Sequence, residues 1–337
     1  MHTTSNHSNL WNAVFMLRAM SLFALVLLWI QGELAWAQNY PVKPIRLIVP
    51  APPGSPPDNV GRWFADKLAP ALGQPVVVDN RVGGGGIIGV EAAAKSAPDG
   101  YTIAYVHQGH MAFNPFLYAR TGYDPIKDFA PVTRTTVIHL VLAVHADVPA
   151  SSVPDLVRLA KEQPGKLSFG SAPIGTPPHI AEQLFRKMAG IETTLVPYKA
   201  GNFAMIDLIA GRVTYTLDGI GITLPHAKSG KVRMLAVSSG KRVPTLPDVP
   251  TIAESGLPGY DYSTWGGFCA PAGTPREIIE RLNTELVKIV RSKESSDWHA
   301  ARGSDPVGDT PEEFAALIKA DYAKWGPIIR EAGIKLE

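Results

Sequence analysis

The chain has 337 residues, and its 32 lysines and arginines nearly balance its 30 aspartates and glutamates, which leaves a formal net charge of +2. This mild balance, without a basic cluster, excludes a protein that binds nucleic acid through strong positive charge, and a composition of 45% hydrophobic and 18% charged residues is typical of a globular fold. The single cysteine, Cys269, excludes an internal disulfide and a zinc site built on several thiolates, and we expect it to be a buried small hydrophobe.

The first 37 residues have the pattern of an export signal. A polar stretch that contains Arg18 precedes a short apolar core at residues 19–30, and Ala35-Trp36-Ala37 fits a small-x-small cleavage site. The apolar core is short for a bilayer span, so an uncleaved membrane anchor is the less favoured alternative. We expect cleavage after Ala37 and a mature periplasmic protein that begins at Gln38.

Strand-like and helix-like segments alternate from residue 45 to residue 106. A buried-strand pattern at 45–49 is followed by an amphipathic helix over 59–72, which Gly73 ends. After these come a strand at 75–78, the glycine run 83–86, a helix at 90–96 and a strand at 101–106. This β-α-β-α-β order predicts a parallel sheet covered on both faces.

A second α/β series occupies the middle of the chain, and the end is helical. The expected strands are 140–144, 167–170, 194–197, 213–217 and 234–238, and the expected helices are 153–163, 178–188, 204–210 and 224–229. A strand over 262–271 then precedes helices at 276–291, 311–319 and 321–332. We therefore expect two lobes, 38–135 plus 265–337 and 136–264, with hinge crossings near 130–142 and 258–270 and a ligand cleft between the lobes.

Two loops at strand ends have the composition of anion-binding sites. The first, 50–58, leads from a strand into a helix, so unpaired N–H groups and the helix dipole would both point at a bound anion. The second, 171–179, offers the hydroxyls of Ser171 and Thr176 and backbone N–H groups at another helix start, although an ordinary capping loop is the alternative. Two such loops facing each other across a cleft would suit a carboxylic acid.

Two further patterns each admit two interpretations. The spacing of Gly84, Gly86 and Gly89 matches a dinucleotide fingerprint. The strand that follows ends at His107 instead of at the acid which that fingerprint needs, so a tight turn with close helix packing is favoured. His107 and His110 could hold a metal, but no carboxylate lies nearby in the sequence, so hydrogen bonding to a ligand or simple loop packing is preferred.

Asp218 ends a strand, where its carboxylate could bind a ligand or hold a hinge turn. Ser171, His179 and Asp218 could together serve an exported hydrolase, but only if the three side chains meet within hydrogen-bond reach. No G-x-S-x-G nucleophile elbow occurs in the sequence, so this catalytic alternative ranks below a binding function.

From Tyr40 to about Ile334 the chain resembles a known family. The resemblance rests on an ordered series of motifs, among them YPVKPIRLIVP, LGQPVVVDNRVGGGGIIG, YDPIKDFAPV, GKVRMLAVSS and LPDVPTIAESGLPGY. None is diagnostic alone, but in this order they mark a resemblance to the periplasmic solute-binding proteins of tripartite tricarboxylate transporters, the Bug-type proteins.

This resemblance implies a type II-like, two-lobed periplasmic-binding-protein fold that closes on its ligand, without catalytic activity, cofactor or metal. The ligand would be a small carboxylate, and the partner would be the permease subunits of a tripartite transporter or, in a sensory role, a receptor's sensor domain. Nucleic acid is not expected as a partner, and the protein would be a monomer. The ligand-binding residues implied are Ala51, Pro53, Gly54, Ser55, Asp58, His107, Gln108, His110, Ser171, Gly175, Thr176, His179 and Asp218.

The first loop departs from the family's usual pattern, which has an aromatic residue and a second glycine. Here Ala51 replaces the aromatic residue and Ser55 replaces the glycine, while Pro56 and Pro57 remove two N–H donors. These changes predict a wider pocket with fewer backbone donors. They favour a larger monoacid, aromatic acids included, over a compact C4 diacid.

Overall fold

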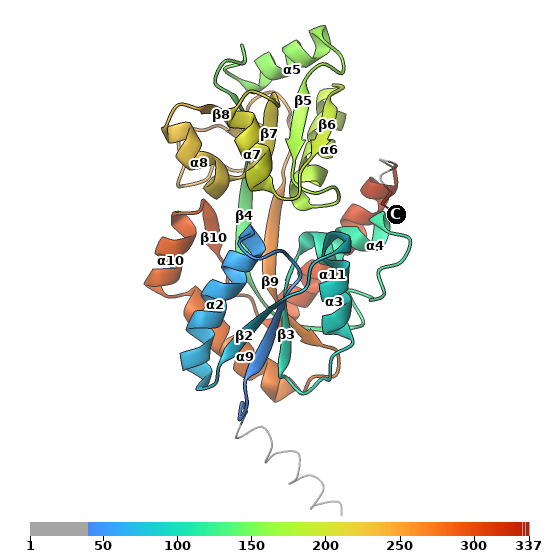
Figure 1. Ribbon diagram of the computed structural model, residues 1–337, viewed down its shortest axis with the longest axis vertical. Helices are drawn as coiled ribbons and strands as arrows, with labels where there is room; N and C mark the ends of the chain where they lie inside the picture. Colours follow the sequence, from blue (N-terminus) through green and yellow to red (C-terminus); the bar gives the residue numbers. More distant parts are fainter. Residues whose placement is uncertain (1–39, 332, 334, 337) are drawn as a thin grey trace, which may run out of the picture. The chain divides into compact units, whose positions relative to one another are not determined.

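The computed structural model describes residues 40–331, 333, 335 and 336, and Figure 1 shows how its helices and strands are arranged. The described residues from Lys43 onward belong to one compact unit. The expected signal segment, 1–37, with its cleavage site after Ala37, lies outside the described residues. Among the helices that are described, none has the length and apolar character needed to cross a membrane.

One sheet of ten strands organises the described part of the chain. Its main path is β2-β1-β3-β9-β4-β7-β5-β6, and β8 and β10 both pair with β4. The strands are β1 (Ile45–Val49), β2 (Val76–Asn80), β3 (Thr102–His107), β4 (Phe129–His145), β5 (Ser168–Ser171), β6 (Thr194–Pro197), β7 (Tyr215–Gly219), β8 (Val232–Val237), β9 (Ser263–Pro271) and β10 (Ser304–Pro306).

The strands of the first series pair in parallel, as the sequence predicted, but the sheet as a whole is mixed. β1 does pair in parallel with β2 and β3, and β5 pairs in parallel with β6 and β7. These two parallel groups are joined by β4 and β9, which are antiparallel to each other and to β3, β7 and β8. The sequence analysis did not foresee the antiparallel pairing of β9 with β3, because β9 comes from far along the chain and no local pattern reveals such a pairing.

β4 is much longer than the strand predicted at 140–144. Its first part pairs with β9 and β10, and its second part pairs with β7 and β8. The β4–β9 register shifts at Pro131/Thr133 and at Arg134/Thr136, as at a β-bulge. β4 and β9 thus run between the two parallel groups (Figure 1), near the predicted hinge crossings. The division into two lobes itself stays a prediction.

Helices cover both parallel groups (Figure 1). They are α2 (Pro56–Leu72), α3 (Ile87–Ala94), α4 (Asn114–Leu117), α5 (Val153–Glu162), α6 (Pro177–Ala189), α7 (Gly201–Ile209), α8 (Ile220–Lys228), α9 (Arg276–Val290), α10 (Lys293–Ala300) and α11 (Pro311–Glu331), with a 3-10 turn η1 (Gly84–Gly86) and a π-helical turn η2 (Gly109–Phe113). The sequence analysis missed η2, α4, α10 and β10. It also divided α11 at Ala320, where the helix continues because alanine favours helix.

The last helix, α11, joins two apolar clusters. One cluster combines β4, β5 and β7 with α5 and α6, and it includes Trp325 and Ile329 of α11. Another combines β1, β3 and β9 with α3, and it includes Phe314 of α11. Cys269 is fully buried in this second cluster, as expected, and burial raises the pKa of its thiol. The α11 helix therefore helps to hold the two parallel groups together.

Candidate functional site

The loop after β1 is closed by the carboxylate of Asp58. Gly54 has a φ of 76°, and its N–H donates to Asp58 Oδ2 at 2.8 Å. Arg62 Nε donates to the same oxygen at 2.9 Å, and Asn80 Nδ2 donates to Oδ1 at 2.8 Å. Asp58 is only 1% exposed. Its burial opposes ionisation, but the hydrogen bonds from Arg62, Asn80 and Gly54 outweigh this effect and lower its pKa.

This first loop satisfies most of its own donors. The N–H and Oγ of Ser55 both donate to the Pro52 carbonyl, at 3.2 and 2.6 Å. Pro56 and Pro57 have no N–H. In the first turn of α2, within the described residues, the N–H of Asp58 therefore has no acceptor. The loop therefore offers one main-chain donor instead of the several expected, and the Asp58 side chain is engaged in holding the loop together.

The loop after β5 is built in the same way. The N–H and Oγ1 of Thr176 donate to the Pro173 carbonyl, at 3.1 and 2.6 Å. Gly175 has a φ of 85° and donates its N–H to His179 Nδ1 at 3.2 Å. Two prolines begin α6, so in the described segment 173–179 the N–H groups of Ile174 and His179 are left without an acceptor, and that of His179 lies at the helix start.

A shared sequence pattern explains this likeness. Both loops read Pro-x-Gly-Ser/Thr-Pro-Pro, followed by a latch residue that accepts from the glycine N–H: Asp58 in the first loop and His179 in the second. The helix-capping residues have nearly the same backbone angles, with φ and ψ of −75° and 161° at Ser55 and −77° and 161° at Thr176. The repeat is visible once the two loops are aligned, and it is the signal that the sequence analysis missed.

Ser171, Ala51 and Pro53 are less directly available than expected. Ser171 is fully buried, and its hydroxyl donates to the Ala172 carbonyl at 2.6 Å. Ala51 is buried, and its carbonyl accepts from Asn80 Nδ2 at 3.0 Å. Pro53 is exposed on the first loop. Neither the Ser171 hydroxyl nor the Ala51 side chain is openly presented in this structure.

His107 and His110 form a stacked pair at the end of β3. Their ring centroids lie 3.6 Å apart, with 26° between the ring planes. Burial lowers the pKa of His107 to about 4. Burial and the nearby His107 lower the pKa of His110 well below its usual value, so both rings are neutral near pH 7. Because the Gly109 N–H donates to His107 Nδ1 at 3.1 Å, the proton of the His107 ring lies on Nε2.

Gln108 was predicted to bind the ligand, but the structure engages its amide elsewhere. The side chain is 2% exposed. Its Nε2 donates to Asp321 Oδ2 at 2.8 Å, and its Oε1 accepts from the Tyr262 hydroxyl at 3.1 Å. Side chains of adjacent residues leave a strand end in different directions, so the spacing of the histidines could not show that Gln108 is turned toward α11.

Asp218 ends β7 beside the start of α7. Its Oδ1 accepts from the Gly219 N–H at 2.7 Å. A Cβ on Gly201, the first residue of α7, would lie only 1.9 Å from Asp218 Oδ2, so this close approach requires glycine. Burial raises the pKa of Asp218 to about 6, and the Gly219 hydrogen bond offsets this only in part. Asp218 is therefore a buried carboxyl group that titrates close to neutral pH.

Two glycines lie where segments that hold predicted site residues pack closely against each other. A Cβ on Gly109 would lie 3.3 Å from Pro177 Cδ, so the turn that holds the histidine pair abuts the start of α6. A Cβ on Gly86 would collide with His110 Nε2 and would lie 3.1 Å from the Pro50 carbonyl oxygen. The glycine run thus packs between the first loop and the histidines. This contact supports the close-packing interpretation of the run over a dinucleotide site.

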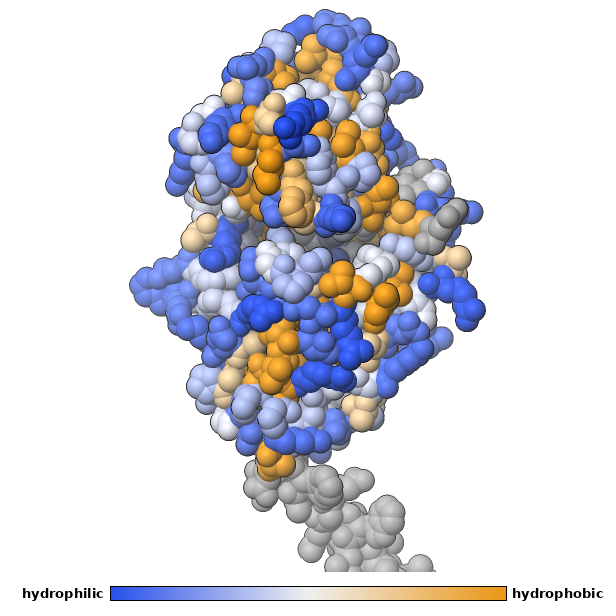
Figure 2. Space-filling model, viewed as in Figure 1, coloured by the Kyte–Doolittle hydropathy of each residue, from blue (hydrophilic) through white to orange (hydrophobic). Residues whose placement is uncertain are grey.

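Exposed apolar side chains lie next to the glycine run and on α7, and the sequence analysis did not identify them. Val82 and Ile88 flank the glycine run, Phe203 and Ile206 lie on α7, and all four are about half exposed. Figure 2 shows apolar patches on both the upper and the lower part of the face in view. Such side chains are suited to contact an apolar part of a ligand or partner.

The catalytic alternative finds no support in the geometry. Within the described chain, the Ser171 hydroxyl donates to a backbone carbonyl, and His179 Nδ1 and Asp218 Oδ1 accept from backbone N–H groups. A nucleophile must instead lie within reach of its base. Among the described residues, no group of three histidine, cysteine, aspartate or glutamate side chains could hold a metal ion.

Comparison with known proteins places the chain among relatives of one kind. Residues 60–334 match the model of the tripartite tricarboxylate transporter family receptor, TctC. The chain is 40% identical over 293 residues to the UPF0065 protein in the tcbD-tcbE intergenic region of Pseudomonas sp., covering 87% of each chain. It is 36% identical over 302 residues to Protein BugT of Bordetella pertussis, covering 89% of this chain and 93% of that one.

Solved structures agree with this relationship. R. palustris Rpa4515 with adipate has a TM-score of 0.83 and 36% identity, over 88% of this chain and 99% of that one. The periplasmic binding protein BugD has a TM-score of 0.80 and 33% identity, over 88% and 100% of the two chains. MatC (Rpa3494) from Rhodopseudomonas palustris with bound malate has a TM-score of 0.79 and 28% identity, over 86% and 100%. These relatives are binding proteins and not enzymes, and the chain belongs to the tripartite tricarboxylate transporter receptor family, with the fold of its periplasmic binding proteins.

Proposed function

We propose that this protein is exported, captures a small carboxylic acid between two lobes and delivers it as a monomer to the membrane permease of a tripartite transporter. Residues 1–37 would be removed after Ala37, and the mature protein would act in the periplasm, as its family members do. The lobes would be 38–135 plus 265–337 and 136–264, with β4 and β9 as the hinge between them. The export signal, the family and the mixed sheet with two parallel groups support this proposal.

The observation that carries the proposal is the pair of matched loops. Each loop leaves one N–H without an acceptor at the start of a helix whose dipole favours an anion, that of Asp58 and that of His179, and the second loop also leaves the N–H of Ile174. The neutral Nε2–H of His107 adds a donor close to the start of α6. A carboxylate has two oxygens, so N–H groups from the two loops can hold one carboxylate between them.

This donor inventory favours a monoacid. The matched segments 52–58 and 173–179 contribute few main-chain donors, those of Asp58, Ile174 and His179, and the predicted ligand residues include no lysine or arginine. We therefore propose a larger monoacid, aromatic acids included, with its apolar part near exposed side chains such as Phe203 and Ile206. Two of the similar structures hold the dicarboxylates adipate and malate, so diacids are the competing ligand class.

A thermal-shift screen followed by calorimetric titration tests this proposal. The panel contains benzoate-type and aliphatic monoacids, C4 and C6 diacids and acidic amino acids, with sugars as controls. A ligand that binds only the folded protein raises its melting temperature, and the rise grows with the logarithm of the ligand concentration relative to Kd. We expect the largest shifts from monoacids, and a weaker shift in Phe203→Ala than in the control Val77→Ala, which alters an exposed valine on β2. Tight malate or succinate binding with inert monoacids would refute the ligand class, and no response to any acid would refute the function.

A further inference from the structure

A cavity of about 260 Å³ lies between α11 and the strands β4 and β9. We call it the α11 cavity and define it by six of its lining residues: Arg134, Thr264, Trp265, Asp321, Lys324 and Trp325. Of the residues predicted to bind the carboxylate, only Gln108 lines it, and the amide of Gln108 is turned away from the histidine pair toward Asp321. The α11 cavity is therefore distinct from the matched loops.

Two unpaired polar groups belong to the lining of this cavity. Four buried side-chain polar atoms in the described chain lack a hydrogen-bond partner, and two of them are Thr264 Oγ1 and Trp325 Nε1. Thr264 is 5% exposed and Trp325 is 2% exposed. A buried polar group without a partner destabilises the folded state. Their concentration at one polar cavity points to an occupant that supplies the missing hydrogen bonds.

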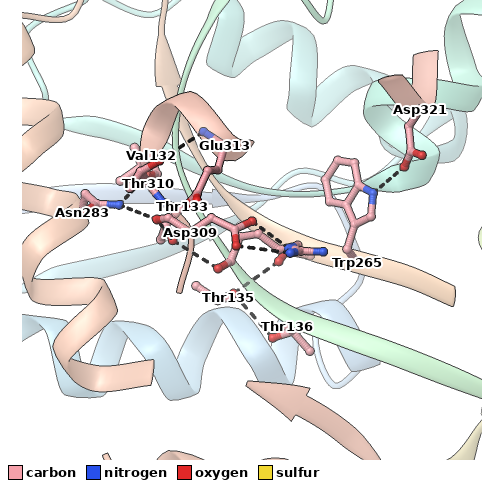
Figure 3. Close-up of polar contacts among 12 residues, drawn as sticks. Val132, Thr133, Thr135, Thr136, Trp265, Asn283, Asp309, Thr310, Glu313 and Asp321 are labelled. Carbon is pink, nitrogen blue, oxygen red and sulfur yellow. Dashed lines mark hydrogen bonds and ion pairs between the residues drawn. The ribbon is translucent and has the colours of Figure 1, made fainter. Parts of the chain in front are cut away.

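The cavity is lined by two carboxylates, Asp261 and Asp321, and by two cations, Arg134 and Lys324. Asp321 Oδ2 accepts from Trp265 Nε1 at 2.6 Å, as Figure 3 shows, and from Gln108, while its Oδ1 has no partner within the described residues. Lys324 Nζ lies 4.9 Å from the centroid of the Trp325 ring and forms no ion pair in the described chain. One carboxylate oxygen and one ammonium group, a single helical turn apart on α11, are thus available to an occupant.

The remaining cation of the cavity is already neutralised. Arg134 Nε and Nη2 donate to the two carboxylate oxygens of Asp309 at 2.8 and 3.2 Å. Asn283 and Thr133 donate to the Asp309 carbonyl, and these contacts hold the segment before α11 in place (Figure 3). Because this arginine is paired, a purely anionic ligand would meet one free cation, Lys324, and the carboxylates of Asp261 and Asp321. An occupant with both charges fits better.

We propose that the α11 cavity is a second binding site, which takes a small zwitterion such as a free α-amino acid. The ammonium group of the ligand pairs with Asp321, where the indole rings of Trp265 and Trp325 add cation–π attraction. Its carboxylate pairs with Lys324. The ligand must be small, because the volume of the cavity is below roughly 300 Å³, the lower end of the range for typical small-molecule pockets.

The tryptophan indole N–H signals of the protein provide a direct test by NMR. Trp265 and Trp325 line the cavity, whereas Trp63 and Trp298 stack on each other with centroids 5.0 Å apart on α2 and α10 and serve as internal controls. Each signal is assigned by a Trp→Phe substitution. We expect glycine, L-alanine and L-valine to shift the Trp265 and Trp325 signals saturably and to leave the other two unchanged. The matched acids without an amine, acetate, propionate and isovalerate, should leave all four unchanged.

Substitutions inside and outside the α11 cavity test whether the amino acids bind there. Lys324→Gln and Thr264→Val should weaken the binding of these amino acids at least about tenfold, which corresponds to about 1.4 kcal/mol. Lys319→Gln, an exposed lysine on the same helix but outside the cavity, should have no effect. His107→Gln, at the histidine pair, should also leave this binding unchanged. The proposal is overturned by absence of a saturable shift, by equal shifts with the amine-free acids, by unchanged affinity in Lys324→Gln, or by loss of binding in His107→Gln.

Discussion

The loops after β1 and β5 have the same backbone hydrogen bonds but different electrostatics. In both, a glycine with positive φ donates to the latch residue, and a hydroxyl residue folds back onto a proline carbonyl. In the first loop the latch is the ionised Asp58, held by Arg62 and Asn80. In the second loop the latch is His179, which burial and the nearby Arg186 keep neutral by lowering its pKa to about 4.

This difference shows that loop shape and loop charge are set separately. Prolines at the first two helix positions and a glycine before the cap fix the backbone in both loops. The latch residue then decides whether the loop carries a negative charge. The first loop holds an ionised carboxylate beside its free N–H, and this charge repels an anion. The second loop is neutral, so it should contribute more to carboxylate binding.

The largest expected effect comes from removing the first latch. Asp58→Ala takes away the acceptor of Gly54, Arg62 and Asn80 in a buried position, so we expect a loss of about 3 kcal/mol in the free energy of unfolding. Asp66→Ala, an exposed acid on the same helix, is the matched control and should cost under about 0.5 kcal/mol. Urea unfolding measures both. A similar small loss in the two variants would show that Asp58 does not hold the loop.

The two latches should differ in their response to acid. The pKa of His179 is about 4 in the folded protein, below its usual 6.5, so its stabilising contribution is complete above about pH 6.5 and is lost as the pH falls toward 4. The loss is up to about 3 kcal/mol. The pKa of Asp58 is lowered from 3.8, so its contribution persists through this window and disappears only at lower pH.

Unfolding measured from pH 7 to pH 4 checks this contrast. His179→Asn should flatten the fall in stability over that range, whereas Asp58→Asn should change the slope only slightly and only near pH 4, because the pKa of Asp58 is 3.8 when unfolded and lower when folded. His107 and His110, whose pKa values are also lowered, contribute to the slope in both variants and do not affect the difference. Equal slopes in wild type and His179→Asn would contradict the neutral latch.

The two glycines offer a comparison of intermediate size. In Gly54→Ala the added Cβ has no atom within 4 Å, so the only loss in the free energy of unfolding is the strain of a positive φ, about 1 kcal/mol. Gly175→Ala adds a Cβ at 2.9 Å from Leu117 Cδ1 and 3.0 Å from Leu336 Cδ1, so we expect about 2 kcal/mol. Thermal unfolding of the two variants under one condition measures the difference. A larger loss in Gly54→Ala would mean that the second loop has more room than the structure shows.

The smallest losses of stability should come from the two capping hydroxyls, and they should be equal because both hydroxyls make the same hydrogen bond. Ser55→Ala and Thr176→Ala each remove a hydroxyl that donates to a proline carbonyl at 2.6 Å, and each should cost about 1 kcal/mol. The carbonyl keeps the N–H of the same residue as a donor in both variants. A clear difference between the two losses, measured by urea unfolding, would break the structural equivalence of the loops.

Part of the site was predictable because it depends on local chemistry. The strand before residue 50, the helix start near Asp58 and the glycine at 54 are all set by neighbours in the chain, and the structure has them in place. The same holds for Gly175 and His179. The engagement of Asp58 with Asn80, and of Gln108 with Asp321, could not be predicted, because each partner arrives from a distant strand or helix.

The sequence by itself determined the α/β class, the family, the position of most helices and strands and the two loops that we propose bind an anion, since short-range periodicity, proline and glycine control these features. Only the tertiary structure decided that β9 inserts between β3 and β4, that α11 joins the two apolar clusters and that the α11 cavity forms beside them. The physical reason is that strand pairing and helix packing join segments far apart in the chain. Which segments meet depends on the whole fold, and no local pattern records it.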